Sequence, residues 1–141
     1  MPDIVHFIII HTPPEKVYNA ITQEEGVRSW WTTRATLKPT QDSIARFDFG
    51  DKYHNEMKIT KLLPDKEVAW QVLKGDKEWV GTLILFYLRE REDGTTGLRF
   101  THAGWKQASD FYGSCNLNWG YYLASLKGFC ETGEGMPFSG A

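Results

Sequence analysis

The stretch that decides the fold is Ser109 to Thr132, which reads SDFYGSCNLNWGYYLASLKGFCET. Its apolar residues recur every three or four positions, the spacing that gathers side chains on one side of an α-helix. They are Tyr112, Cys115, Trp119, Tyr122, Leu123, Leu126, Phe129 and Cys130. At 1.5 Å per residue this helix is about 36 Å long, and Gly133 and Pro137 follow its expected end. So long an apolar stripe needs a large partner surface, and the preceding residues predict a sheet.

Between Ser43 and Gly104 the apolar period changes from three or four to two. Ala45, Phe47 and Phe49 alternate with polar residues, as do Met57 and Ile59, and this pattern is typical of half-buried antiparallel strands. Turn dipeptides separate the strands: Gly50-Asp51, Pro64-Asp65, Gly75-Asp76 and Asp93-Gly94. Further strands are expected over Glu67–Lys74, Lys77–Glu92 and Thr95–Ala103.

The N-terminal part predicts one strand followed by two short helices. Ile4 to His11 is rich in β-branched residues and stops at two prolines. Thr12-x-x-Glu15 and Thr22-x-x-Glu25 both fit capping boxes. The chain therefore predicts an α+β domain in which one long helix covers one face of an antiparallel sheet.

Composition narrows the classes of function. The 141 residues carry a net charge of −2 with no basic run, which argues against nucleic acid and anionic membranes as partners. No apolar segment approaches the ~20 residues of a membrane helix, and the N-terminus has no basic segment followed by an apolar one. We therefore expect one domain over residues 1–141 and a cytoplasmic location. Six Trp, six Tyr and eight Phe are a heavy aromatic load.

Several strings, in this order, resemble the START-like (SRPBCC, helix-grip) superfamily, and most closely the C-terminal domain of the activator of heat-shock chaperone ATPase. They are Thr12-Pro13-Pro14-Glu15-Lys16-Val17-Tyr18, Trp30-Trp31, Gly81-Thr82-Leu83-Ile84-Leu85-Phe86, Thr95-x-x-Leu98-Arg-Phe-Thr-His102-x-Gly104-Trp105 and Trp119-x-x-x-Leu123-x-x-Leu126-Lys127.

The resemblance implies a curved antiparallel sheet of about six strands wrapped around the C-terminal helix, with a cavity for an apolar ligand between them. Members of the superfamily bind lipids, sterols, hormones or polyketide intermediates, and some are enzymes, so the fold alone does not select a function. The family name adds a chaperone as a possible partner. The full chaperone activator carries a further domain ahead of this one, for which 141 residues leave no room, and this weakens that possibility.

A ligand pocket is expected where the inner faces of sheet and helix meet. The candidate lining is Trp30, Phe47, Phe49, Met57, Trp70, Phe86, Phe100, His102, Trp119, Tyr122 and Leu123. The alternative is that these side chains fill the space themselves, since protein interiors are close-packed. An empty apolar void of about 300 Å³ would cost roughly 7 kcal/mol, so any large cavity must be partly polar, occupied or closed.

His102 has the strand parity of Leu98 and Phe100 and should point inward with them. It would orient a polar ligand group or transfer a proton. The alternative is a core histidine bonded to its neighbours. A proton-transfer role would need a carboxylate partner, and Glu56, Glu78 and Asp110 are only weak candidates, so no catalytic residue is assigned.

Neither a metal site nor a disulfide is expected. No third ligand accompanies His54 and Glu56 at a recognisable spacing. Cys115 and Cys130 lie fifteen residues apart on one helix, about 22 Å, beyond the ~7 Å limit for a bridge. No cofactor is expected. Trp31 and Trp105 are either exposed in a partner-binding patch or close the ends of the fold.

The sequence therefore leads to three hypotheses. The first is binding, without catalysis, of a small and largely apolar molecule, such as a lipid, sterol or aromatic metabolite. The second is a protein-interaction module that stimulates a chaperone ATPase. The third is an enzyme that acts on a pocket-bound hydrophobic substrate through His102.

Overall fold

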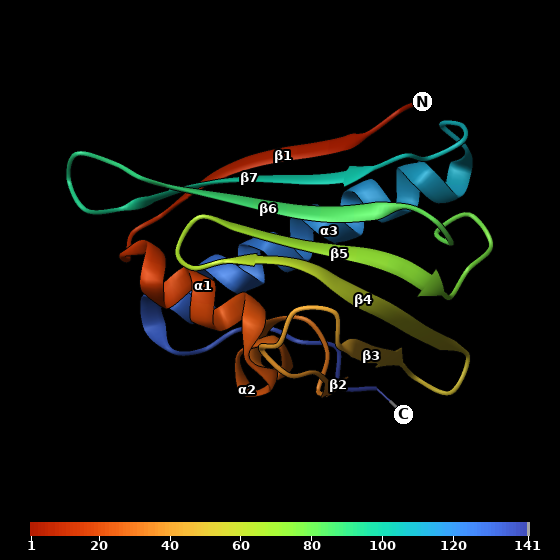
Figure 1. Ribbon diagram of the computed structural model, residues 1–141, viewed down its shortest axis with the longest axis horizontal. Coiled ribbons are helices and arrows are strands. Elements are labelled where there is room, and N and C mark those ends of the chain that lie inside the picture. The colour runs from red at the N-terminus through yellow and green to blue at the C-terminus, as the bar shows by residue number, and fades with distance from the viewer. Residues whose placement is uncertain (141) are drawn as a thin grey trace.

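The computed structural model describes residues 1–140, which form one strand, two short helices, six further strands and a long C-terminal helix (Figure 1). In chain order these are β1 (Ile4–Ile10), α1 (Pro14–Thr22), α2 (Glu24–Trp30), β2 (Arg34–Thr36), β3 (Ile44–Phe49), β4 (Tyr53–Leu63), β5 (Glu67–Lys74), β6 (Leu83–Glu90), β7 (Thr96–Ala103) and α3 (Asp110–Thr132). The fold class expected from the sequence is confirmed.

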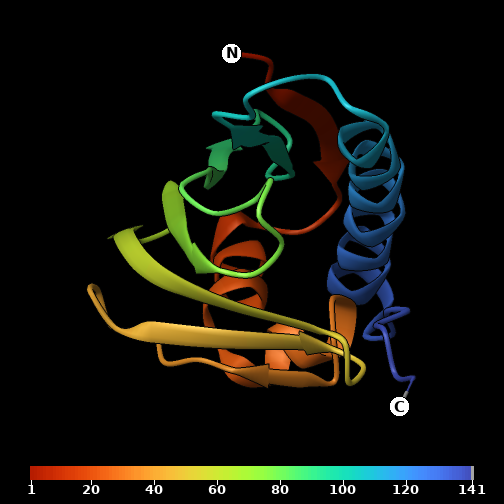
Figure 2. The same ribbon diagram turned by 90° about the vertical axis from the view of Figure 1, so that its right-hand side faces the viewer.

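The seven strands form one antiparallel sheet in the order β1-β7-β6-β5-β4-β3-β2. Figure 2 shows the sheet curling around α3, while α1 and α2 pack together and both contact α3. The expectation of about six strands missed β2, whose three residues pair with β3. Three residues are too few for an alternating pattern to be visible in a sequence.

The long helix has the limits and the buried stripe that the sequence predicts. The Ser109 hydroxyl accepts a hydrogen bond from the Tyr112 backbone N–H at 3.1 Å, which caps the N-terminus. Gly133 ends the helix with a φ of 88°, a left-handed conformation that glycine adopts without strain. Of the predicted stripe, five residues are fully buried: Cys115, Trp119, Leu123, Leu126 and Cys130.

Both capping boxes predicted for the short helices are wrong. Pro13 is the N-cap of α1 and Gln23 that of α2, and neither provides a side-chain cap. Thr12 instead accepts a hydrogen bond at its carbonyl from the Thr96 hydroxyl, 2.7 Å away on β7. Thr22 belongs to α1, where its hydroxyl donates to the Tyr18 carbonyl at 2.7 Å. A hydrogen bond within α1 thus replaces the cap predicted at Thr22, whereas the Thr12 hydroxyl is buried without a hydrogen-bond partner among residues 1–140.

The turn predicted at Asp93-Gly94 is confirmed. The strand expected over Lys77–Glu92 begins later than predicted, at Leu83. Residues 77–81 form turns instead, and Gly81 has a φ of 87°, which is strained for other residues. This turn carries Trp79 out of the sheet and toward α3, where its indole ring stacks on Trp119 with ring centres 6.1 Å apart.

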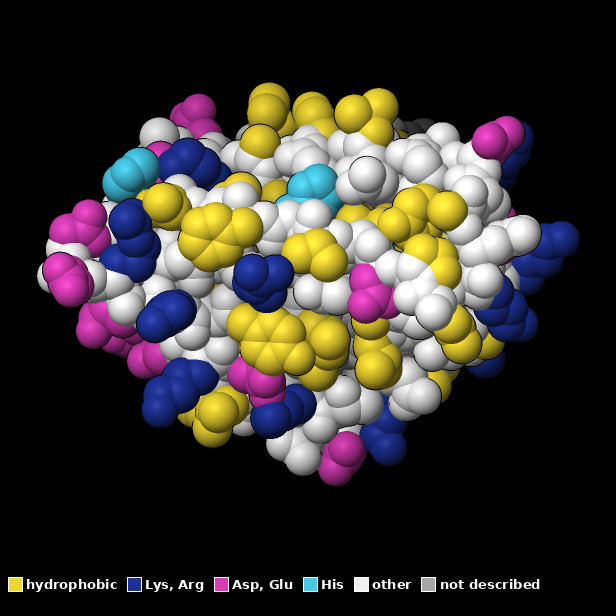
Figure 3. All heavy atoms as spheres, turned by 90° about the horizontal axis from the view of Figure 1, so that it is seen from above, with side chains coloured by type: hydrophobic (Ala, Val, Ile, Leu, Met, Phe, Trp, Pro, Cys, Tyr) yellow, Lys and Arg dark blue, Asp and Glu magenta, His cyan; other side chains and the backbone are white. Residues whose placement is uncertain are grey.

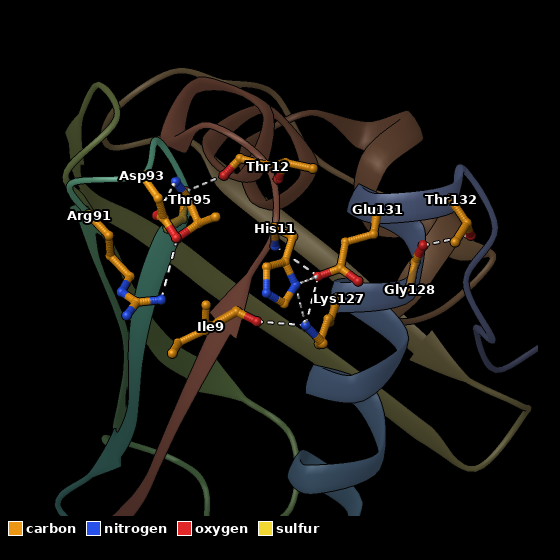
Figure 4. Close-up of polar contacts among 11 residues, drawn as sticks. Ile9, His11, Thr12, Arg91, Asp93, Thr95, Lys127, Gly128, Glu131 and Thr132 are labelled. Atoms are coloured by element: carbon orange, nitrogen blue, oxygen red, sulfur yellow. Dashed lines mark hydrogen bonds and ion pairs between the residues drawn. The ribbon is translucent and has the colours of Figure 1, made fainter.

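Polar contacts join the C-terminal end of α3 to the end of β1 (Figure 4). The Lys127 ammonium donates to the Ile9 carbonyl at 2.7 Å and to the Glu131 carboxylate at 2.7 Å. The same carboxylate accepts from the His11 backbone N–H at 2.8 Å. This group, Lys127, Glu131 and His11, is the β1 clamp. Because β1 is an edge strand, the clamp also occupies backbone groups that a free edge would expose.

The face on the β1 side carries Lys and Arg side chains interspersed with Asp and Glu and with apolar groups (Figure 3). Val5 and Phe7 of β1 are among the exposed apolar residues of the chain. Within residues 1–140, none of the helices is both long and apolar enough to cross a membrane.

Candidate functional site

A pocket of about 390 Å³ lies between the N-terminal half of α3 and the strands at the β2 side of the sheet. Strands β3 and β4 contribute Phe49, Tyr53 and Asn55, and the β5–β6 connection contributes Asp76 and Trp79. The rest of the lining is Trp31, Phe111, Cys115, Asn118, Trp119, Tyr122 and Phe138. The pocket is thus built from segments spread between residues 31 and 138, and most of its wall is aromatic.

Three indole rings lie nearly parallel along the pocket. Trp31 stacks on Trp119 with ring centres 5.1 Å apart and planes 26° apart, and Trp119 stacks on Trp79 at 6.1 Å and 13°. Phe49 meets Trp31 edge-on at 5.1 Å and lies 5.6 Å from Phe138. These offset and edge contacts are the arrangements that aromatic rings prefer, so the rings hold one another while leaving space beside them.

A buried hydrogen-bond chain behind the pocket wall fixes the Trp119 indole and the backbone of Trp79. The Trp119 indole N–H donates to Nδ1 of His102 at 3.1 Å. Because an indole can only donate, Nδ1 is the acceptor and the proton is on Nε2. Nε2 then donates to the Thr82 hydroxyl at 2.8 Å, which donates to the Trp79 carbonyl at 2.6 Å. We call these residues, His102, Thr82, Trp119 and Trp79, the His102 chain.

Burial holds His102 in the neutral form. Its side chain is fully buried, and loss of solvation lowers the pKa to about 3. Both ring nitrogens are engaged within the protein, so the His102 ring has no nitrogen free to contact a bound molecule. The residue corresponds to the core histidine that the sequence left open as an alternative. It holds the Trp119 indole, which lines the pocket, in place.

Cys115 is held in a similar way. The Trp79 indole N–H donates to its sulfur at 3.4 Å, and burial raises the pKa of the thiol to about 11. A thiol that stays protonated is a weak nucleophile and a poor metal ligand. Cys130 is also buried, and neither cysteine forms a disulfide. Residues 1–140 contain no cluster of three or more His, Cys, Asp or Glu side chains that would hold a metal ion.

Polar groups gather at one side of the pocket, where β4 faces the β5–β6 connection. Asn55 is buried on β4, and Asp76 is half-buried. Gly75, with a φ of 150°, lies against the Asn55 side chain so closely that a Cβ there would collide with its amide oxygen. Glycine at this position thus allows the turn that brings Asp76 beside Asn55.

The structure brings only some of the predicted lining residues together in this pocket. Phe49, Trp119 and Tyr122 line it. The others lie outside the lining and are buried in the core: Trp30, Phe47, Met57, Trp70, Phe86, Phe100, His102 and Leu123. The rings of four of them, Phe47, Trp70, Phe86 and Phe100, form a continuous row. The ring centres are 5.2 Å apart for Phe47 and Trp70, 5.0 Å for Trp70 and Phe86, and 5.4 Å for Phe86 and Phe100. We call these four the packed row.

The predicted pocket residues missed several parts of the wall. Trp31 carried a signal, because the sequence left open that it closes an end of the fold, and Trp79 lies in a turn where a strand was expected. Both are buried. Trp105 is buried too, so neither it nor Trp31 belongs to an exposed patch. Phe138 carried no periodic signal at all. Its backbone pairs with Trp31 and Thr33 through bonds of 2.8 and 3.0 Å, and this pairing brings the C-terminal segment to the pocket.

A curved antiparallel sheet around a C-terminal helix, with a pocket between the two, defines the START-like, helix-grip class of proteins. The sequence matches the family described as "Activator of Hsp90 ATPase homolog 1-like protein" over residues 11–131. The chain belongs to this family.

Solved structures agree with this assignment. The Aha1 dimer from Colwellia psychrerythraea is 39% identical, with a TM-score of 0.86 over 96% of this chain and 100% of that one. The protein MLL2253 from Mesorhizobium loti shares the fold at 20% identity and a TM-score of 0.79, over 89% and 94% of the two chains. DynU16, a putative protein in the dynemicin biosynthetic locus, does so at 18% and 0.78, over 94% of this chain and 48% of its own. Among curated proteins, none matches the sequence.

Proposed function

We propose that this protein binds a small, largely apolar molecule in the pocket between α3 and the sheet, without transforming it. The observation that carries the proposal is the pocket of about 390 Å³ whose wall is mostly aromatic, a size and lining typical of sites for small molecules. The polar groups at one side would satisfy or orient a polar part of the ligand. A cytoplasmic location remains part of this proposal.

Packing energy also favours a bound molecule in the pocket. Aromatic side chains that do not fill their space forgo packing contacts, yet the packed row a few ångströms away shows that this chain can fill space with the same residue types. A bound molecule would restore those contacts. Nothing comparable favours a catalytic role for His102, because both of its ring nitrogens bond within the protein.

The test is a titration of intrinsic Trp fluorescence with fatty acids, sterols and aromatic metabolites, since Trp31, Trp79 and Trp119 line the pocket. An Asn118→Trp variant would narrow the pocket at its rim, and we expect it to weaken binding at least tenfold. Asn116→Trp is the matched control, because Asn116 is also exposed on α3 but lies outside the lining. No response across the panel, or equal weakening by both variants, would contradict the proposal.

A second candidate function is stimulation of a chaperone ATPase, which the family description and the 39% identity to an Aha1 protein favour. It predicts saturable binding to Hsp90 from the same source and faster ATP turnover. The experiment is a pull-down combined with an ATPase assay on the purified chaperone. Absence of binding together with an unchanged rate would exclude this role.

A further inference from the structure

The charge of the pocket lining is one-sided. Its twelve residues include one acidic residue, Asp76, and no Lys, Arg or His. The other polar residues of the lining, Tyr53, Asn55 and Asn118 among them, carry amide or hydroxyl groups. A ligand that fills this pocket therefore meets one carboxylate. If the ligand carries a negative charge, the lining offers no positively charged side chain to pair with it.

The Asp76 carboxylate can accept further hydrogen bonds. Its Oδ1 accepts a hydrogen bond from the Glu78 backbone N–H at 2.9 Å. Within residues 1–140, neither Asp76 nor Glu78 forms an ion pair with a Lys, Arg or His, and no side chain or backbone group donates to Oδ2 of Asp76. Asp76 is also half-buried, so water screens it less than a fully exposed carboxylate.

The aromatic wall points to the same chemistry. The indole N–H groups of Trp79 and Trp119 are already used, by Cys115 and His102. Neither of these N–H groups is therefore free to donate a hydrogen bond to an anionic group of a ligand. An unpaired carboxylate in a largely aromatic wall without Lys, Arg or His is complementary to an apolar molecule that carries a positive charge.

We infer that the pocket selects organic cations, in particular amines attached to an apolar or aromatic body, with Asp76 contacting the ammonium group. The inference rests on the proposed function, whose ligand it specifies. It predicts that fatty acids and other anionic amphiphiles bind more weakly than amines of the same size.

The test compares three probes that share one apolar body: 4-phenylbutylammonium, 4-phenylbutan-1-ol and 4-phenylbutanoate. Affinities are measured by Trp fluorescence excited at a wavelength that the phenyl ring does not absorb, and by calorimetry. We expect the ammonium probe to bind about tenfold more tightly than the alcohol, from one ion pair with a half-buried carboxylate. The carboxylate probe should be the weakest.

Asp76→Asn removes the charge and keeps an oxygen for the Glu78 N–H, so the ammonium probe should fall to the affinity of the alcohol. Asp93→Asn is the matched control. Asp93 accepts from the backbone N–H two residues later, at 3.1 Å, as Asp76 does, but lies outside the pocket lining. Asp76→Lys should reverse the preference toward 4-phenylbutanoate.

The outcomes separate the two claims. If all three probes bind alike, or the carboxylate binds best, the inference fails while the proposed function stands. An ammonium preference that survives Asp76→Asn would overturn the role of Asp76. If no probe binds the wild-type protein at any concentration, both the inference and the proposed function lose their support.

Discussion

The packed row and the pocket are both built from aromatic side chains between α3 and the sheet, yet one fills its space and the other encloses it. In the packed row, β3, β5, β6 and β7 each place one ring on the inner face, and the ring centres are 5.0 to 5.4 Å apart. In the pocket the rings come from the ends of β3 and β4, from the end of α2, the β5–β6 connection, α3 and the C-terminal segment. The difference teaches that rings from the middle of strands pack closely, while rings from strand ends, connections and the C-terminal segment leave room for a ligand.

The largest predicted effect is on the packed row. Phe86 is fully buried and contacts Trp30, Trp70 and Phe100. Phe86→Ala should lower the free energy of unfolding by about 3–5 kcal/mol, because the neighbours cannot collapse into the cavity. Chemical denaturation measures the loss. If Phe86→Ala does not fold, Phe86→Leu should show a smaller loss of the same sign.

Phe138→Ala is the corresponding change in the pocket. Phe138 is half-buried and stands at the edge of existing space, so its loss should cost much less than that of Phe86. Equal losses at the two positions would erase the distinction between a packed and an enclosing region.

The next effect is the pH dependence of stability that the His102 chain causes. This chain lies behind the pocket wall and contacts the packed row, because the ring centres of Trp119 and Phe100 are 4.4 Å apart. Burial holds the pKa of His102 near 3 in the folded protein, against about 6.5 in the unfolded chain. The unfolded chain therefore takes up a proton first as the pH falls. The stability from neutral His102 is complete above pH 6.5 and decreases by about 1.4 kcal/mol per pH unit from there toward pH 3.

Denaturation curves at several values of pH between 7 and 4 would measure this slope. His102→Gln should be less stable at pH 7 and should show a shallower decline, because glutamine does not titrate. Parallel slopes for wild type and variant would mean that another group causes the acid sensitivity.

A smaller effect tests close packing between the short helices. Gly26 lies in α2, where Ala is normally favoured over Gly by about 1 kcal/mol. Here a Cβ would lie 2.6 Å from the Ala20 carbonyl oxygen, so Gly26→Ala should destabilise by about 1–3 kcal/mol. Gly113→Ala in α3 is the control, since a Cβ there meets no atom within 4 Å. The control should be neutral or stabilising in the same thermal melts.

The smallest effect is expected at the β1 clamp. The hydrogen bond from Lys127, aided by that from the His11 backbone, lowers the pKa of Glu131 to about 2. Stability from this carboxylate is therefore present above about pH 4.5 and is lost as the pH falls toward 2. Because the ion pair is partly exposed to solvent, Glu131→Gln should cost no more than about 1 kcal/mol at pH 7.

The difference between wild type and Glu131→Gln should shrink at pH 3. Glu134→Gln, at an exposed position without an ion pair in residues 1–140, should change nothing. A constant difference across this range would show that the clamp acts through shape and not through charge.

The sequence was sufficient for the fold because its strongest signals are periodic. The stripe of α3, the alternation around Phe47 and the Asp93-Gly94 turn each follow from local geometry, and all three are confirmed. The capping boxes failed because α1 begins one residue later than expected, with Pro13 as its N-cap, and because the Thr22 hydroxyl bonds within its own helix. A local motif does not distinguish these outcomes.

Less of the pocket could be foreseen. Periodicity identifies side chains that face inward, and most of these fill the core, as Trp70 and Phe100 do, while Phe49, Trp119 and Tyr122 line the pocket. Other parts of the pocket wall lie in turns and segments without period, such as Asp76 and Phe138, and their positions depend on contacts with distant parts of the chain. The inward orientation of His102 was predictable, but its hydrogen-bond partners were not.

The place of Phe138 in the pocket has a consequence for truncated forms of the chain. The segment that carries it follows α3 and is joined to Trp31 and Thr33 by backbone hydrogen bonds. Removal of this segment would take away one wall of the pocket and leave β1 to β7, α3 and the packed row in the chain. Such a truncated chain would keep the residues of its core and lose part of its binding site.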